Sequence, residues 1–155
     1  MYKKKVIIIA GSNSDVDFAR KIGNHLKEFD IDYEIKIASA HRSTKELLKL
    51  LELYTNLKVP FITVAGKLDV LSGIVAANTT NPVIACPPDT DDWNRLSEVR
   101  KIEILSSLDV PNVASFGLAI GSLNAARQAA KILALEDKEL ARKLFSLLPK
   151  NSRNK

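Results

Sequence analysis

The stretch "KVIIIAGSNSD", residues 5–15, passes from a continuous apolar run into a small polar loop. Four β-branched residues in a row are typical of a strand that is covered on both faces of a sheet. The segment after the loop has a helical period, with apolar residues at Ala19, Ile22, Leu26 and Phe29. The stretch therefore predicts a buried strand, a tight loop and an amphipathic helix.

The same alternation recurs along the chain. Four more strand-like runs, "DYEIKIAS", "PFITVAG", "NPVIACPP" and "NVASFGLA", occupy residues 32–39, 60–66, 81–88 and 112–119, with segments of helical period between them. Strands that alternate with helices predict parallel βαβ units with right-handed crossovers. The second run alternates apolar and charged residues, which favours an edge position. We expect a three-layer, doubly wound α/β fold of the flavodoxin-like type with strand order 2-1-3-4-5.

Helix boundaries are also readable in places. Ser43 followed by Glu46 has the spacing of a capping box, so a helix should begin just after Arg42, with an apolar stripe at Leu47, Leu48, Leu51 and Tyr54. Two C-terminal helices are expected in "NAARQAAKILAL" and "KELARKLFSLL", residues 124–135 and 138–148. Because no linker or repeat divides the chain, we expect a single catalytic domain over residues 1–155, with a basic tail from about residue 149.

Charge is concentrated near the ends of the chain. The 155 residues include 23 Lys or Arg and 18 Asp or Glu, which gives a net charge of +5. Without Lys3, Lys4, Lys5, Lys150, Arg153 and Lys155, 17 basic residues face 18 acidic ones. Basic ends on a nearly neutral body are typical of solvated termini, so we expect no nucleic-acid partner.

Other classes of protein are disfavoured as well. No apolar run approaches the ~18 residues of a membrane span, and the apolar run after the basic start is too short for a signal peptide. We therefore expect a cytoplasmic protein with no membrane partner. Cys86 is the only cysteine, so an internal disulfide framework is excluded, and one cysteine with two separated histidines predicts no metal site.

The expected crevice lies at the carboxyl ends of the strands, near the switch between strands one and three. In the loop "GSNSD", Gly11 would allow a sharp turn, and Ser12 and Ser14 offer hydroxyl groups. The free N–H groups at the start of the following helix favour a phosphate. The alternative is that Ser14 or Asp15 only caps that helix. Without a GxxxxGK[ST] or GxGxxG motif, a nucleoside triphosphate or a dinucleotide is disfavoured.

The loop "SAHRS", residues 39–43, is expected at the same edge. Arg42 can hold a phosphate with its fork of donors, and Ser39 can add a hydroxyl group. Asp15 accepts hydrogen bonds and suits ribose hydroxyls. Together these groups fit a ribose phosphate, with His41 beyond the sugar as a group that donates and accepts a proton near neutral pH. The alternative is an Arg-His pair on the surface of a loop.

The motifs "AGSNSD", "SAHRS" and "NAARQAAKILAL", in this order, resemble the aminoimidazole ribonucleotide carboxylase family of purine biosynthesis, from about Lys5 to Leu135. That family includes the N5-carboxyaminoimidazole ribonucleotide mutases. The resemblance implies an enzyme that places a carboxyl group on ring carbon C4 of aminoimidazole ribonucleotide without ATP, biotin or metal, and a homo-oligomer, usually an octamer. It implies that His41 handles the proton. The implied substrate-binding residues are Gly11, Ser12, Ser14, Asp15, Ser39, Ala40, Arg42, Gly66 and Lys67.

One loop separates the two branches of that family. The mutases carry a Gly/Ala-rich loop with a second histidine after strand three, whereas this chain reads "AGKLDVLSG". The branch that uses carbon dioxide directly has a basic residue here, which Lys67 matches, and a run like "CPPDTDDW". Leu68 and Asp69 depart from the Ser-Asn of that branch, and Asp69 should pair with Lys67 or face away. We favour direct carboxylation and keep the mutase reaction, and a solvated Lys67, as alternatives.

Other functions could be carried by the same fold. A non-catalytic sugar-phosphate sensor would use the same crevice without turnover, and a flavin could bind at the switch point. A phosphoacceptor receiver domain needs an acidic pair after strand one and an aspartate at the end of strand three, which this chain lacks. His25 is expected at the surface or boundary of the first helix and Cys86 in the core, whereas Trp93 could cover the ring or simply pack.

Overall fold

Five parallel strands form the centre of the molecule, hydrogen-bonded in the order β2-β1-β3-β4-β5. The computed structural model describes residues 4–149 of the chain. The strands are β1 (Lys5–Ala10), β2 (Asp32–Ile37), β3 (Phe61–Val64), β4 (Val83–Ala85) and β5 (Gly117–Leu118). Each lies inside one of the five runs that the sequence predicts, and every pair in the sheet is parallel. The expected doubly wound α/β fold with strand order 2-1-3-4-5 is confirmed.

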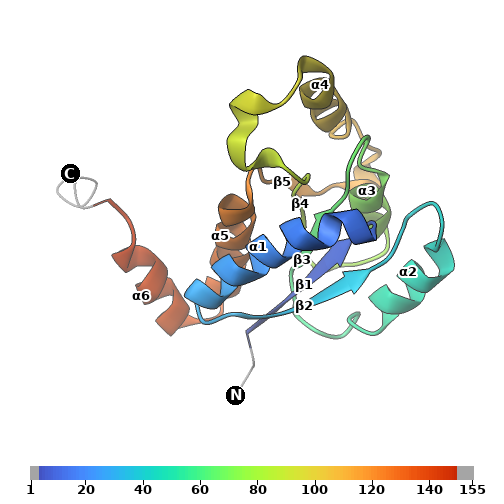
Figure 1. Cartoon of the computed structure of the whole chain (residues 1–155). Coiled ribbons are helices and arrows are strands. Elements are labelled where there is room, and N and C mark those ends of the chain that lie inside the picture. Colours follow the sequence, from blue (N-terminus) through green and yellow to red (C-terminus); the bar gives the residue numbers. More distant parts are fainter. Residues whose placement is uncertain (1–3, 150–155) are drawn as a thin grey trace.

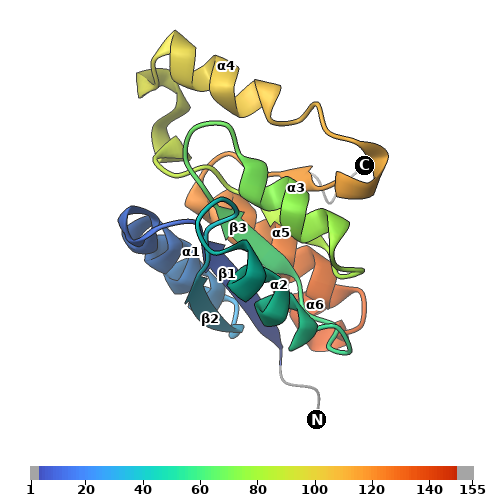
Figure 2. The same cartoon turned by 90° about the vertical axis from the view of Figure 1, so that its right-hand side faces the viewer.

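Helices cover both faces of this sheet and give the three layers seen in Figure 1. One face carries α1 (Val16–Glu28), α5 (Ser122–Ala134) and α6 (Lys138–Ser146), and the other carries α2 (Thr44–Glu52) and α3 (Val70–Ala77). The helix α4 (Glu98–Ser106) lies apart from both layers, beyond the end of the sheet (Figures 1 and 2). Short 3-10 helices η1 (Asn13–Asp15), η2 (Thr90–Arg95) and η3 (Asn112–Ala114) lie in the loops.

The uninterrupted apolar sequence of β1 follows from its two covered faces. Val6 and Ile8 are buried on the α1 side, whereas Ile7 and Ile9 are buried on the α2 side. Because successive side chains of a strand point to opposite faces, both sets must be apolar when both faces are covered. Of the expected helix stripes, Leu48 is only partly buried. The buried members are Ala19, Ile22, Leu26, Phe29, Leu47, Leu51 and Tyr54.

The strand β2 lies at an edge of the sheet and pairs only with β1. Its residues are half-buried or exposed, which explains why its sequence alternates. Glu34 uses this half-open position to accept hydrogen bonds from the Lys5 ammonium group and from the Tyr54 hydroxyl, the latter at 2.8 Å. The alternating strand is therefore tied through one carboxylate to β1 and to the segment after α2.

The expectation of solvated basic ends is wrong for two residues. The Lys4 ammonium nitrogen lies 3.1 Å from the Asp137 carboxylate, and Lys5 is the first residue of β1 and pairs with Glu34. Both lysines are part of the fold because carboxylates compensate their charges. The remaining terminal cations, and the basic tail beyond residue 149, lie outside the described residues. Within residues 4–149, no helix is both long and apolar enough to cross a lipid bilayer.

Candidate active site

The loops after β1, β2 and β3 begin side by side at the carboxyl edge of the sheet. The Gly11 N–H donates to the Val64 carbonyl at 2.8 Å, and the Ala38 N–H donates to the Ala10 carbonyl at 3.0 Å. A Cβ added to Gly11 would lie 3.4 Å from the Ala65 side chain. The chain bends at Gly11, as expected, although its backbone is not left-handed. The first and third loops are in contact at this glycine.

Side chains of the "GSNSD" loop bind one another. The Ser12 hydroxyl donates to an Asp15 carboxylate oxygen at 2.8 Å, and the Ser12 and Ser14 hydroxyl oxygens are 2.7 Å apart. Asp15 is only 8% exposed, whereas Ser14 is exposed. Asp15 is the N-cap residue of α1, yet its side chain accepts no capping hydrogen bond, and neither does Ser12 for η1. The interpretation that this loop only caps its helix is therefore wrong.

The "SAHRS" loop forms a tight turn between β2 and α2. The Arg42 N–H donates to the Ser39 hydroxyl oxygen at 3.2 Å, and the Ser39 N–H donates to the Ser43 hydroxyl oxygen at 2.9 Å. Ala40 is buried, whereas His41 and Arg42 are exposed. Among residues 4–149, neither the imidazole nor the guanidinium group of this pair has a hydrogen bond or an ion pair.

The helix α2 begins at Thr44, as the sequence predicts, but the expected capping box is wrong. Ser43 is the N-cap residue, and its side chain makes no capping hydrogen bond to the helix. Its hydroxyl oxygen accepts from Ser39 instead, which closes the turn that precedes the helix. The start of α2 is thereby left without a side-chain cap.

The start of α5 is capped by a distant segment. The Asp91 carboxylate accepts from the Ser122 N–H at 2.7 Å, and the Thr90 hydroxyl oxygen accepts from the Gly121 N–H at 2.9 Å. Burial acts to raise the pKa of Asp91, but the hydrogen bonds from Ser122 outweigh it and hold this pKa below its usual range. The Lys21 ammonium group lies 3.7 Å from the same carboxylate. Sequence reasoning missed this cap because 31 residues separate its partners.

Helix starts therefore fall into two groups. Side chains cap α3 (Asp69), α4 (Ser97), α6 (Asp137) and, from a distance, α5 (Asp91). Among the α-helices of the described chain, only α1 and α2 begin without a side-chain hydrogen bond on their first turn. These two helices follow the "GSNSD" and "SAHRS" loops. On the α1 side the Val16 N–H donates to the Asn13 carbonyl, so the start without a side-chain cap is that of η1, which runs directly into α1. The N–H groups at the starts of η1 and α2, which favour an anion, thus lie where the sequence predicts a phosphate.

The loop after β3 is built differently. A Cβ added to Gly66 would meet no atom within 4 Å, so this residue borders open space. Lys67 is exposed and has a left-handed backbone, with φ 55°. Asp69 is 5% exposed and accepts from both the N–H and the hydroxyl of Ser72, at the start of α3. Of the two expected placements for Asp69, it adopts the one that faces away from Lys67.

The charge state of Asp69 is shaped by its surroundings. Burial raises its pKa, and the nearby Asp15 carboxylate raises it further, whereas the Ser72 hydrogen bonds and the Arg100 charge act in the opposite direction. Burial is the largest of these effects, so the pKa of Asp69 lies above its usual range.

The other residues considered from the sequence have structural surroundings. His25 is half-buried on α1, with its Nδ1 3.1 Å from the Glu28 carboxylate. Burial raises the pKa of the Cys86 thiol to about 12, so this side chain is not a thiolate nucleophile near neutral pH. Trp93 is half-buried in η2.

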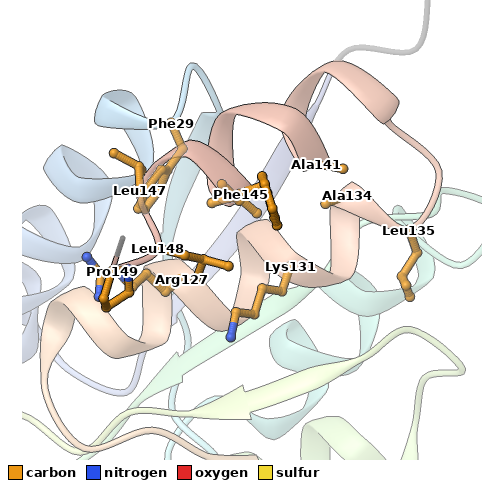
Figure 3. Close-up of a pocket in the computed structure, with 11 residues that line it drawn as sticks. Phe29, Arg127, Lys131, Ala134, Leu135, Ala141, Phe145, Leu147, Leu148 and Pro149 are labelled. Carbon is orange, nitrogen blue, oxygen red and sulfur yellow. The ribbon is translucent and has the colours of Figure 1, made fainter. Parts of the chain in front are cut away.

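Of three cavities, two lie away from the loops just described, and the third includes Leu68 and Asp69 of the loop after β3. The one shown in Figure 3, about 470 Å³, lies between α5 and α6 and is lined by apolar side chains such as Leu144 and Leu148. A second, about 440 Å³, lies near Lys4, Pro60 and Asp137 at the opposite edge of the sheet. A third, about 620 Å³, is lined by residues of α2, α3 and the segment 106–114. None of these three cavities is lined by Ser12, His41 or Arg42.

Known proteins are similar to this chain in sequence and in fold. A relative from Archaeoglobus fulgidus, named phosphoribosylaminoimidazole carboxylase, is 40% identical over 140 residues, which are 90% of this chain and 74% of the relative. A relative from Methanocaldococcus jannaschii, named N5-carboxyaminoimidazole ribonucleotide mutase, is 43% identical over 144 residues, or 90% and 85% of the two chains. The crystal structure of Treponema denticola PurE matches with a TM-score of 0.84 at 37% identity and covers 97% of this chain and 93% of that chain. The profile of the family AIR carboxylase matches residues 5–153. This protein is therefore a member of the AIR carboxylase family of purine-biosynthesis enzymes.

Proposed function

We propose that the protein carboxylates aminoimidazole ribonucleotide at ring carbon C4, with carbon dioxide as the direct source of the new carboxyl group. The observation that carries the proposal is the pair of uncapped helix starts, η1 (which runs into α1) and α2, beside the switch between β1 and β3. Both starts lie next to hydroxyl groups, and one lies next to the guanidinium group of Arg42, which has no partner in the part of the chain that the structure describes. This combination suits the phosphate of a ribonucleotide.

The proposed site binds the ribose phosphate at one end and the imidazole ring at the other. The phosphate lies between Ser12, Ser14, Ser39 and Arg42, because serine hydroxyls rotate freely and can turn from each other towards an anion. The ribose hydroxyls donate to the Asp15 carboxylate, which Ser12 already orients. Gly11, Ala40 and Gly66 present backbone rather than side chains to the nucleotide, which leaves room for it. The imidazole ring then lies towards His41 and the loop that carries Lys67.

The chemistry needs one group that moves a proton. The exocyclic amine makes C4 nucleophilic, and C4 attacks carbon dioxide to form the new C–C bond. The tetrahedral carbon then carries both a hydrogen and the carboxylate. His41 takes that hydrogen as a proton, the electron pair returns to the ring, and aromaticity is restored. Proton transfer by a placed base contributes roughly 10²–10⁴ in rate.

Lys67 supports the choice of direct carboxylation. Its ammonium group extends from a loop next to open space and can stabilise the carboxylate as it forms. Asp69 does not oppose this role, because its carboxylate is turned into the start of α3. No second histidine occurs in residues 66–73, where the mutases of the family carry one.

The mutase reaction is the second candidate, and the 43% identity to a relative named as a mutase favours it. In that reaction His41 first protonates the carbamate nitrogen of the N5-carboxylated isomer, and the C–N bond breaks to release carbon dioxide. The same carbon dioxide is attacked by C4, and His41 takes the C4 proton. Both reactions therefore use one imidazole and give one product.

Two parallel assays decide between the reactions. One supplies aminoimidazole ribonucleotide with bicarbonate, and the other supplies the N5-carboxylated isomer, with product followed by chromatography. We expect product from the first assay at a rate that rises with dissolved carbon dioxide. Product from the isomer alone would assign the chain to the mutases. A purified protein that binds the nucleotide and converts neither substrate would instead be a sugar-phosphate sensor.

A further inference from the structure

The loop from Gly66 to Asp69 keeps a conformation that needs support. Lys67 has a left-handed backbone (φ 55°), which is uncommon for a residue with a Cβ and is found at sites where neighbours enforce it. Asp69 secures the end of the loop through the N–H of Ser72, at 3.0 Å. Gly66 borders open space and provides no side chain to hold the start. The middle of the loop therefore depends on another group.

That group is Arg100 on α4. Its Nη1 donates to the main-chain carbonyl of Lys67 at 3.0 Å, across 33 residues of sequence. The same nitrogen donates to the Glu103 carboxylate at 3.2 Å, which orients the guanidinium group from within the helix. Figure 2 shows α4 lying over the end of the sheet, above the loop that joins β3 to α3. A helix outside both layers thus reaches the loop through one side chain.

Arg100 is an energetically unfavourable residue for holding α4 against the loop after β3. Its side chain is 18% exposed, and its Nη2 is buried without a hydrogen-bond partner among the described residues. A buried charged donor without an acceptor destabilises a fold, whereas an apolar side chain of similar length does not. Groups that weaken the fold while fixing a local conformation are typical of functional sites.

We propose that Arg100 is a positioning residue that fixes the backbone of Lys67, so that α4 determines where the Lys67 ammonium group stands in the crevice. The proposal rests on the proposed function, in which that ammonium group stabilises the new carboxylate. Arg100 acts through the loop and does not touch the nucleotide. Its loss therefore affects the carboxylation step and leaves the phosphate end unchanged.

The test compares Arg100→Met with Lys101→Met. Lys101 is a matched control because it is the next residue of α4 and is 21% exposed. Among the described residues its side chain pairs only along the helix, with Glu98 at 2.8 Å. Arg100→Lys is a conservative variant that keeps one donor for the Lys67 carbonyl. Hydrogen–deuterium exchange of residues 66–72, unfolding by urea, nucleotide binding and turnover are measured for all three variants and for the unaltered chain.

In Arg100→Met we expect the loop amides to exchange about tenfold faster or more. We expect turnover to fall on the order of tenfold, nucleotide affinity to stay within about twofold, and the urea midpoint to stay near that of Lys101→Met. Arg100→Lys should recover part of the turnover. A purely structural arginine would instead lower the urea midpoint and leave the turnover per folded molecule unchanged.

Three other results would contradict the proposal or part of it. Equal exchange in Arg100→Met and Lys101→Met would overturn the anchoring of the loop. Faster exchange with unchanged turnover would overturn the positioning role. If the unaltered chain converts neither substrate, the proposed function fails and the kinetic part of the proposal fails with it, whereas the exchange experiment still decides whether Arg100 anchors the loop.

Discussion

His41 is exposed on the turn between β2 and α2, and no group among the described residues holds its imidazole. A ring without a protein partner can reach both an exocyclic nitrogen and a ring carbon of a bound substrate, which a shuttle requires. We expect His41→Asn to lose at least roughly 10²-fold in turnover while still binding product, because asparagine keeps a polar contact and cannot carry the proton. Turnover and product affinity should be measured together. Near-normal turnover would remove His41 from the mechanism.

Arg42 should affect binding instead of chemistry. A phosphate anchor far from the reacting carbon stabilises the substrate and the transition state alike, so Arg42→Ala should raise KM with little change in kcat. Loss of a charge-assisted contact corresponds to roughly 10- to 100-fold in affinity. Arg20→Ala is the control, because Arg20 is an exposed arginine on α1 that, within residues 4–149, pairs only with Asp17. A fall in kcat at unchanged affinity would show that the phosphate is bound elsewhere.

For single residues, the sequence predicts groups that are near one another in the chain. It misses contacts between residues that are far apart in the chain. "GSNSD" and "SAHRS" are continuous motifs, and their positions at strand ends follow from the alternation of strands and helices. Asp91 and Arg100 act on residues 31 and 33 positions away, and nothing in their local sequence marks them. The expected capping box at Ser43 does not form, because its hydroxyl oxygen accepts a hydrogen bond from the Ser39 N–H instead.

Among the elements, α1 packs closely against the side chain of Tyr33 in β2 at Gly23. A Cβ added to Gly23 would lie 2.3 Å from the ring of Tyr33, far inside contact distance. Alanine favours a helix over glycine by about 1 kcal/mol, but overpacking of this severity costs about 1–3 kcal/mol. The steric clash should outweigh the gain in helix propensity, so we expect Gly23→Ala to lower the free energy of unfolding measured in urea.

Two further variants separate these effects. Gly73, also in a helix, would place its Cβ 3.7 Å from that of Ala114, an ordinary contact, so Gly73→Ala should be neutral or stabilising. Replacing Tyr33 by leucine should relieve most of the cost of Gly23→Ala, which a double-mutant cycle measures. Additive effects of the two substitutions would show that the ring is not the obstacle.

Glu34 ties the edge strand β2 to its neighbours. Hydrogen bonds from Lys5, then Tyr54 and Lys36, lower the pKa of Glu34 from the ordinary 4.5 to about 2. Because the folded value lies below the unfolded one, this carboxylate adds stability above the unfolded value and loses it as the pH falls towards the folded one. The urea midpoint should therefore drop between about pH 5 and pH 2, and drop less in Glu34→Gln than in a Glu52→Gln control. Equal pH dependence in both variants would contradict the role of Glu34.

Strands and helices are predicted most reliably where burial imposes a period. The strands β1 to β4 and the helices α1 and α2 carry such a period, and each forms where the sequence places it. The last run, residues 112–119, forms only the two-residue strand Gly117–Leu118, because its first half is taken up by η3. The helix α4 buries Ile104 but leaves Val99, Ile102 and Leu105 exposed, so most of its apolar residues do not mark a face of the core.

For the molecule as a whole, these exposed apolar side chains need an explanation. Besides the three on α4, Leu135 is 85% exposed and Phe145 is 60% exposed, beside the apolar cavity of Figure 3. Large apolar patches on a small protein are typical of surfaces that bind other chains. We propose that copies of this chain cover them, as the resemblance to octameric enzymes also implies.

Sedimentation tests this proposal directly. We expect a mass that is a multiple of the 17.1 kDa chain, and a smaller species for Phe145→Glu, because a buried charge without a partner weakens an apolar interface. Leu53→Glu serves as a control, since Leu53 is an exposed apolar residue just after α2 that lies outside the cavity between α5 and α6. A single-chain mass for the unaltered protein would refute assembly. An unchanged mass in Phe145→Glu would place the contact on another face, of which the exposed side of α4 is the next to test.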